Sequence, residues 1–413
     1  MQQTAPEGQA HGRGPVPFGP PGAAPGLPVL PELAARLAAA AAHAEPEPVG
    51  GGARTLDAAC GYWSRRGLWT DPFHVAAAPG AEPLLLALLA ATGGDVLLSR
   101  PCAAWYAPQP RLLGRQAYHV PTPAECGGVP DPFALLETVR RVREEGGDPR
   151  VLLLSVADDP TGTVAPPELL HEVCEAALGE GLLIVSDETY RDTVHDPAAT
   201  VLLSPAEMHP QDVVVLADLG AALVPPGWPA AVARFPGTWR GAELHAATLD
   251  ALAALRALLT PPVAAAVAHA LAEPETVAVR AAAATRVHAA LAAALHATVT
   301  GAGAVARPPQ AGSHLYADLD PLRPALAARD VNDSVELEDD LTARLGVPVP
   351  GGHRFGDAPD ALRVRLSTGM LLGASEEERL AALTAPDPLE LPHVRAALRL
   401  FGSALAERDG ARR

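Results

Sequence analysis

The segment Val213–Phe235, VVVLADLGAALVPPGWPAAVARF, joins a continuous apolar run to a loop of small residues and the sequence PPGW. The run VVVLA has the β-branched, wholly apolar composition of a strand that is buried on both faces of a parallel sheet. Similar runs recur upstream, and segments with helical periodicity separate them. This alternation predicts an α/β protein with a mainly parallel sheet covered by helices.

The apolar runs predict where the strands lie in the sequence. The predicted strands are FHVAAA (73–78), GDVLLSR (94–100), VLLLSVA (151–157), GLLIVSDE (181–188) and DVVVLAD (212–218). Predicted helices lie between them at 30–44, 53–66, 79–92, 133–145 and 166–178, and residues 240–296 are almost wholly helical with a break at Pro261 and Pro262. After residue 300 the pattern changes to an edge strand (312–320), a helix (337–346), a strand (362–369) and an added terminal helix (391–407).

These patterns predict three parts of the chain. Residues 1–28 are rich in proline and glycine, which predicts a disordered or extended arm. Residues 29–290 form a large α/β domain, within which we expect 29–45 to pack on the smaller domain. Residues 291–413 form that smaller α+β domain with an extra C-terminal helix.

Composition excludes several classes of function. The formal net charge of −17 and the pI of about 5.2 oppose binding to a phosphate backbone, so no nucleic-acid partner is expected. No apolar run reaches the length of a membrane helix, and no basic segment precedes an apolar one, so we expect a cytoplasmic protein with no membrane partner. The four cysteines have no metal-type spacing and are expected to be reduced thiols, with no metal site: Cys60, Cys102, Cys126 and Cys174.

Polar residues gather where predicted strands end, which is where parallel sheets bind ligands. Gly80, Ala81 and Glu82 begin a predicted helix, whose free backbone N–H groups favour an anion. Asp187 ends a strand and Tyr190 follows three residues later, so both side chains can face one pocket. A turn before a helix and a helix cap are the ordinary alternatives for these segments.

Two further candidates come from separate parts of the chain. Asp159 lies in DDPTG directly after the strand VLLLSVA, and Arg365 lies in LRVRLS on the smaller domain. An arginine there can bind a carboxylate across the domain cleft. The ordinary alternatives are a proline turn and a solvated arginine.

Taken in order, these segments resemble the class I/II aminotransferases, which are pyridoxal phosphate enzymes of fold type I, over roughly residues 25–385. GAEPLLLALL looks like the family's phosphate-binding turn, DPTG like its Asn-Pro-Thr-Gly, DETY like its Asp-Glu-x-Tyr, and PGW like the motif after its cofactor lysine. GVPVPGGHRFGD looks like its small-domain loop and VRLS like its arginine strand. The resemblance implies a large domain with a seven-stranded, mainly parallel sheet and a smaller α+β domain.

The resemblance also implies roles for individual residues. Asp187 would keep the pyridine nitrogen of the cofactor protonated, which makes the ring an electron sink, and Tyr190 would bond its phenolate oxygen. Arg365 would bind the substrate carboxylate. The positions that match cofactor contacts are Gly80, Ala81, Glu82, Asp159, Asp187 and Tyr190.

The departures from the family pattern concern the reactive groups themselves. The cofactor lysine falls on Ala221, and no shift of register can restore it because all 31 Lys and Arg residues of the sequence are arginine. The phosphate-binding arginine falls on Pro229. The aromatic residue that stacks on the cofactor ring falls on Ala103, unless Trp105 or Tyr106 reaches the pocket. The tyrosine that a neighbouring subunit donates in the family has no counterpart.

These departures change what the pocket can do. Alanine can neither form the internal imine nor carry a proton, so lysine-dependent transamination is not possible in this chain. Charge contacts of this kind contribute about 1.5–3 kcal/mol each, so losing two or three weakens pyridoxal phosphate binding by several orders of magnitude. Carboxylates that share a site recruit a cation or raise one pKa. Asp159 and Asp187 would face one cavity, with Asp158 and Asp218 not far away, which leads to the hypothesis of a pocket that prefers a cationic ligand or metal. The ordinary alternative is that these acids are solvated on the cavity wall.

Two functions remain open from the sequence. In the first, the chain keeps the fold for a binding or partner-subunit role, as a homodimer or as a heterodimer with a lysine-bearing aminotransferase, like the non-catalytic subunit of serine palmitoyltransferase. In the second, it is an enzyme of altered mechanism that acts on an amino acid or amine. That enzyme would hold pyridoxal phosphate non-covalently, or dispense with it, and use Asp159, Asp187 and Tyr190 as acid and base. A transcriptional-regulator relative would need a DNA-binding segment, and none is visible.

Overall fold

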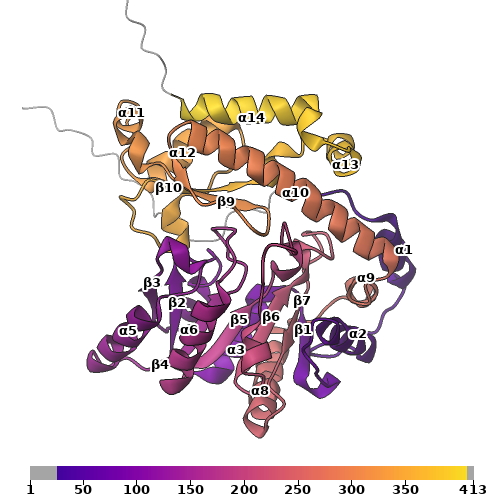
Figure 1. Cartoon of the computed structure of the whole chain (residues 1–413). Coiled ribbons are helices and arrows are strands. Elements are labelled where there is room, and N and C mark those ends of the chain that lie inside the picture. The colour runs from indigo at the N-terminus through magenta and orange to yellow at the C-terminus, as the bar shows by residue number, and fades with distance from the viewer. Residues whose placement is uncertain (1–25, 407–413) are drawn as a thin grey trace, which may run out of the picture.

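The computed structural model describes residues 26–406 and contains two sheets (Figure 1). The larger sheet has seven strands in the order β1-β7-β6-β5-β4-β2-β3. Its strand β7 is antiparallel to both neighbours and the other adjacent pairs are parallel, so the predicted α/β fold is confirmed. The strands are β1 (Val75–Ala78), β2 (Asp95–Arg100), β3 (Ala117–Pro121), β4 (Pro149–Ser155), β5 (Leu183–Asp187), β6 (Val213–Asp218) and β7 (Ala231–Arg234).

Helices on both faces explain why the strands are apolar throughout. In β6, Val213 and Val215 join one buried cluster, whereas Val214 and Leu216 join another on the opposite face. The first face is covered by α2 (Ala53–Ser64), α5 (Pro132–Glu144), α6 (Pro167–Gly179) and α9 (Pro261–Leu271). The second is covered by α3 (Ala81–Thr92) and α8 (Trp239–Leu255), which pack on each other. Short helices α4 (Pro108–Leu112) and α7 (Pro205–Met208) lie in the connections.

The smaller domain is built on a three-stranded antiparallel sheet. Its strands are β8 (Val305–Ala306), β9 (His314–Asp318) and β10 (Arg363–Ser367), and its helices are α11 (Arg323–Ala327), α12 (Ser334–Leu345), α13 (Glu376–Thr384) and α14 (Pro392–Leu405). Strand β9 lies in the middle of this sheet, so its prediction as an edge strand was wrong. The two-residue strand β8, which is too short to give a sequence pattern, covers its second edge.

One long helix, α10 (Glu275–Gly301), joins the two domains and runs diagonally across Figure 1. Its residue Val277 belongs to the core of the sheet domain, whereas Val287 and Leu291 belong to the core of the smaller domain. The expected boundary at 290/291 therefore falls inside a continuous helix that contributes to both cores.

The N-terminal part of the described chain crosses both domains. Helix α1 (Pro31–Ala40) packs on α9, and its Leu33 belongs to the core of the sheet domain rather than to the smaller domain expected for 29–45. Leu27, ahead of that helix, packs on the core of the smaller domain. Most of the predicted arm over 1–28 lies outside the described residues. None of the described helices has the length and apolar character needed to span a membrane.

Candidate functional site

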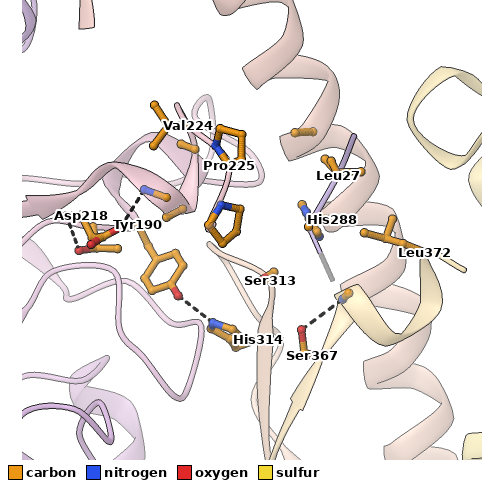
Figure 2. A pocket seen from close by; sticks show the side chains of 18 of the residues that line it. Leu27, Tyr190, Asp218, Val224, Pro225, His288, Ser313, His314, Ser367 and Leu372 are labelled. Atoms are coloured by element: carbon orange, nitrogen blue, oxygen red, sulfur yellow. Dashed lines mark hydrogen bonds between the residues drawn. The ribbon is translucent and has the colours of Figure 1, made fainter. Parts of the chain in front are cut away.

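A cavity of about 1040 Å³ opens where β4, β5 and β6 end, between the two domains and the segment 26–30. Figure 2 shows it from close by. It brings together the positions predicted for cofactor and substrate contacts and for the lysine: Gly80, Ala81, Glu82, Asp159, Asp187, Tyr190, Ala221 and Arg365 all line it. Asp158, which the sequence grouped with the carboxylates of this site, does not line the cavity. The side chains that face it are largely paired with one another, and four of these pairings define its chemistry.

The first pairing is at the start of α3, where the resemblance places a phosphate group. Asp218, at the end of β6, accepts hydrogen bonds from the backbone N–H of Ala81 (3.1 Å) and of Gly220 (2.8 Å). Burial raises the pKa of Asp218 to about 6, although these two N–H groups lower it. The chain's own carboxylate thus occupies a helix N-terminus that would otherwise attract an anion.

The second pairing is at the end of β5. Asp187 accepts a hydrogen bond from the buried hydroxyl of Tyr106 (2.6 Å) and another from the N–H of Thr189 (2.9 Å). Burial raises the pKa of this carboxyl. Of the three positions considered for the stacking aromatic residue, Trp105 lines the cavity, whereas Tyr106 and Ala103 are buried in the core and do not.

The third pairing crosses the domain cleft. Both carboxylate oxygens of Asp159 accept hydrogen bonds from Nη1 of Arg365, at 2.8 and 2.9 Å. Burial raises the pKa of Asp159, but the guanidinium outweighs it and holds the pKa below its usual value. The arginine that the resemblance assigns to a substrate carboxylate is therefore bound to a carboxylate of the same chain.

The fourth pairing joins Tyr190 to His314 of β9, as the dashed line in Figure 2 shows. The tyrosine hydroxyl lies 2.9 Å from Nε2 of the histidine, and the rings meet edge to face. Burial lowers the pKa of His314 to about 3, helped by the charge of Arg365, and burial raises the pKa of Tyr190. Both groups are therefore neutral at physiological pH. Gly312 permits this packing, since a Cβ there would lie 3.2 Å from the Tyr190 ring.

Other residues near the cavity were missed by sequence reasoning. Arg280 of α10 donates a hydrogen bond to the carbonyl of Pro28, and its Nη1 is buried without a hydrogen-bond partner among residues 26–406. The lining residues without a predicted role include Thr189, Arg280, His288, His314, Glu378 and His393. An isolated histidine or arginine on a helix or strand carries no signal that it faces a cavity, so only the folded arrangement identifies them.

Ala221 lies in a single helical turn, Leu219–Ala221, directly after β6. Ala221 and Pro229, where the sequence resemblance puts the family's lysine and arginine, both line the cavity. Neither offers a charge or a proton, so within residues 26–406 these two positions supply no cation to balance Asp218.

The chain belongs to the class I and II aminotransferase family, whose model matches residues 66–372. A probable aspartate/prephenate aminotransferase of Thermus aquaticus is 30% identical over 165 residues, which are 39% of this chain and 41% of that relative. The aspartate/prephenate aminotransferase of Thermus thermophilus is 27% identical over 165 residues, or 39% of this chain and 40% of that one. The chain thus matches about two fifths of the length of these curated relatives.

Solved structures resemble this fold over a larger share of the chain than the sequence matches cover. The aspartate aminotransferase of Thermus thermophilus with maleate has a TM-score of 0.75 at 22% identity, covering 92% of this chain and 90% of that chain. The N-succinyldiaminopimelate aminotransferase of Mycobacterium tuberculosis has a TM-score of 0.74 at 23% identity, covering 92% of each. At such identities the likeness establishes the fold, and function must be argued from the site.

Proposed function

We propose that this chain is a non-transaminating member of the family that binds a small amine in its cleft without pyridoxal phosphate. The observation that carries this proposal is the position of Asp218, whose carboxylate accepts the N–H of Ala81 at the start of α3. A bound phosphate group would have to displace this carboxylate or lie against its negative charge. The residues present therefore do not fit the cofactor that the resemblance implies.

The rest of the cofactor site supports the same proposal. Ala221 stands at the lysine position of a chain without lysine, and Pro229 stands at the arginine position. Asp187 already accepts a hydrogen bond from Tyr106, so a pyridine nitrogen would compete with that hydroxyl. Covalent attachment, phosphate binding and ring protonation are each weakened by a different residue.

The charges of the cavity favour a ligand with an amine. Five carboxylates and two guanidinium groups line it, and one of those guanidinium groups is paired with Asp159. Asp187 and Asp218 accept the hydrogen bonds described above and retain lone pairs for an ammonium donor. Arg280, with an unpartnered Nη1 among residues 26–406, could hold an acid at the far end of the same ligand.

The alternative is an enzyme of altered mechanism with non-covalently held pyridoxal phosphate. Asp159, Asp187 and Tyr190 would be its acid and base. In the fold Asp159 is bound to Arg365 and Asp187 to Tyr106, and the Tyr190 hydroxyl lies 2.9 Å from Nε2 of His314. Burial raises the pKa of Tyr190 and lowers that of His314, in both cases away from neutrality, which makes these two a poor proton-transfer pair near pH 7. The binding role is compatible with a homodimer or with a heterodimer containing a lysine-bearing aminotransferase. Light scattering on the purified chain tests the homodimer, and a monomer in that measurement would favour the heterodimer.

Calorimetric titration with pyridoxal phosphate at pH 7.5 tests the loss of the cofactor. We expect no saturable binding by the wild type or by Ala221→Lys, and saturable binding by Ala221→Lys/Asp218→Ser, with covalent attachment after borohydride reduction. Equal binding by the single and double variants would contradict the role given to Asp218. Micromolar binding by the wild type would overturn the proposal and favour the altered-mechanism enzyme.

Three probes with the same four-carbon chain test the ligand class: 1,4-diaminobutane, 4-aminobutanoate and succinate. We expect calorimetric binding of the two amines and none of succinate, and weaker amine binding by Asp218→Asn because that variant loses a carboxylate. Binding of succinate alone would contradict the amine proposal and would point to Arg280 as the dominant group.

A further inference from the structure

A second group of polar side chains lies outside the cleft, where α6 meets the end of α7. His171 and Glu175 are four residues apart and so lie on one face of α6, and His209 directly follows α7. One donor atom from each of the three residues lies within 4.8 Å of the others. The two imidazole rings are parallel within 3°, with their centres 6.0 Å apart.

The backbone holds His209 firmly in this position. Helix α7 begins with a reciprocal cap between Ser204 and Glu207, and the N–H of His209 donates to the carbonyl of Pro205 at 2.8 Å. The preceding residue, Met208, packs on the core of the sheet domain. The imidazole is therefore presented to α6 by a fixed turn rather than by a mobile loop.

The hydrogen bonding of His209 is incomplete. Its side chain is only 15% exposed, and its Nε2 is buried without a hydrogen-bond partner among residues 26–406. That atom lies 3.4 Å from Oε1 of Glu175, whose side chain is exposed. A buried nitrogen that lacks a partner costs free energy, so this geometry calls for a further atom between the two groups.

We propose that His171, Glu175 and His209 form a binding site for a divalent transition metal of the zinc class. Two imidazole nitrogens and one carboxylate oxygen are zinc donors, and three protein ligands leave the fourth tetrahedral position to water. Two ligands about 2.1 Å from a tetrahedral ion lie roughly 3.4 Å apart, which is the observed separation of Nε2 and Oε1. Imidazole donors disfavour Mg²⁺ and Ca²⁺, which prefer oxygen.

The site would link two segments of the chain, because His209 lies 34 residues beyond Glu175. Helix α7 leads directly into β6, whose end forms part of the cleft. A metal that binds the folded chain alone stabilises it by mass action. The proposal is independent of the ligand of the cleft, because none of the three residues lines that cavity.

The test is calorimetric titration of zinc into the full chain, purified without a histidine tag and treated with a chelator. We expect one saturable site for the wild type and for His43→Ala, which removes an exposed histidine elsewhere. Loss of a residue that merely orients a metal ligand costs about 10–100-fold in affinity, so His171→Ala, His209→Ala and Glu175→Gln should each lose at least as much. Magnesium should not compete.

Cobalt(II) provides a second readout, since tetrahedral coordination by nitrogen and oxygen gives a visible spectrum that the variants should lack. Glu175→Gln changes an exposed side chain, so it keeps the test decisive if a histidine variant folds poorly. Zinc affinity that is the same in Glu175→Gln and wild type, or no saturable binding to the wild type, would overturn the proposal.

Discussion

The cleft and the α6–α7 cluster, which consists of His171, Glu175 and His209, differ in the hydrogen bonds that their side chains form. In the cleft, Asp159 binds Arg365, Tyr190 bonds His314, and Asp218 caps the start of α3. In the cluster, His209 is buried beside Glu175 with its Nε2 unpartnered within the described chain. The cleft is not fully satisfied either, since Nε of Arg365, Nδ1 of His314 and Nη1 of Arg280 are buried without a hydrogen-bond partner among residues 26–406. The difference is that side chains of the cleft bond one another across the two domains and so become part of the fold, whereas Nε2 of His209 bonds no other side chain of the described residues.

If the paired side chains of the cleft are part of the fold, breaking one pair should lower the free energy of unfolding. Arg365→Met leaves Asp159 as a buried carboxylate without its cation, and we expect a loss of about 3–5 kcal/mol in the free energy of unfolding. Urea denaturation of the wild type and of Arg365→Met measures this loss in the free energy of unfolding.

Two controls sharpen that measurement. Asp159→Asn/Arg365→Met removes both charges and should recover much of the loss. Arg140→Met breaks two exposed ion pairs, with Glu137 and with Glu144, and should change little. If Arg140→Met lowered the free energy of unfolding as much as Arg365→Met, the buried Asp159–Arg365 pair would contribute no more to stability than an exposed pair.

Asp158 precedes Asp159 in the chain but is buried behind the cavity rather than lining it. Among the described residues its carboxylate accepts hydrogen bonds only from Thr161 and has no cation beside it. Burial raises its pKa from 3.8 to about 7, while the bonds from Thr161 act against that rise. The unfolded chain releases this proton near pH 4 and the folded chain near pH 7. Ionised Asp158 therefore lowers stability as the pH rises through this window.

Asp158→Asn should remove this pH dependence. We expect the variant to be more stable than the wild type by about 2–4 kcal/mol at pH 8, and the difference to shrink toward zero by pH 4. Urea denaturation at pH 4, 6 and 8 checks it, with the exposed Asp250→Asn as a control that should follow the wild type. A constant difference at all three pH values would mean that Asp158 does not titrate in this window.

The sequence predicted the cleft better than it predicted the pairs within it. Continuous apolar runs such as VVVLA need two covered faces, and this fixed the parallel sheet and the strand ends where Asp187 and Asp218 lie. Three strands were not predicted: β3, β7 and β8. The edge strand β3 has the mixed sequence AYHVP, the sequence AVAR of β7 is surrounded by alanine and proline, and β8 is only two residues long. The Asp159–Arg365 contact joins residues 206 apart and depends on how the small domain faces the sheet.

The α6–α7 cluster likewise depends on a contact between residues far apart in the sequence, which no local pattern predicts. The spacing of His171 and Glu175 places both on one helix face, which is readable from the sequence, but four-residue spacings of this kind are common on exposed helices. His209 comes from a turn 34 residues beyond Glu175, and no local pattern aims its ring at α6. Only the packing of α6 on α7 makes three separate residues into one group.

The smallest effect is expected at this cluster when no metal is present. Glu175→Gln alters an exposed side chain that no pairing in the core depends on, so in a chelating buffer its free energy of unfolding should lie within about 0.5 kcal/mol of the wild type. Adding zinc should raise the melting temperature of the wild type and leave that of the variant unchanged, because only the wild type gains from metal binding to the folded state. If Glu175→Gln lost much stability in the chelating buffer, Glu175 would stabilise the fold without a metal, as the side-chain pairs of the cleft do.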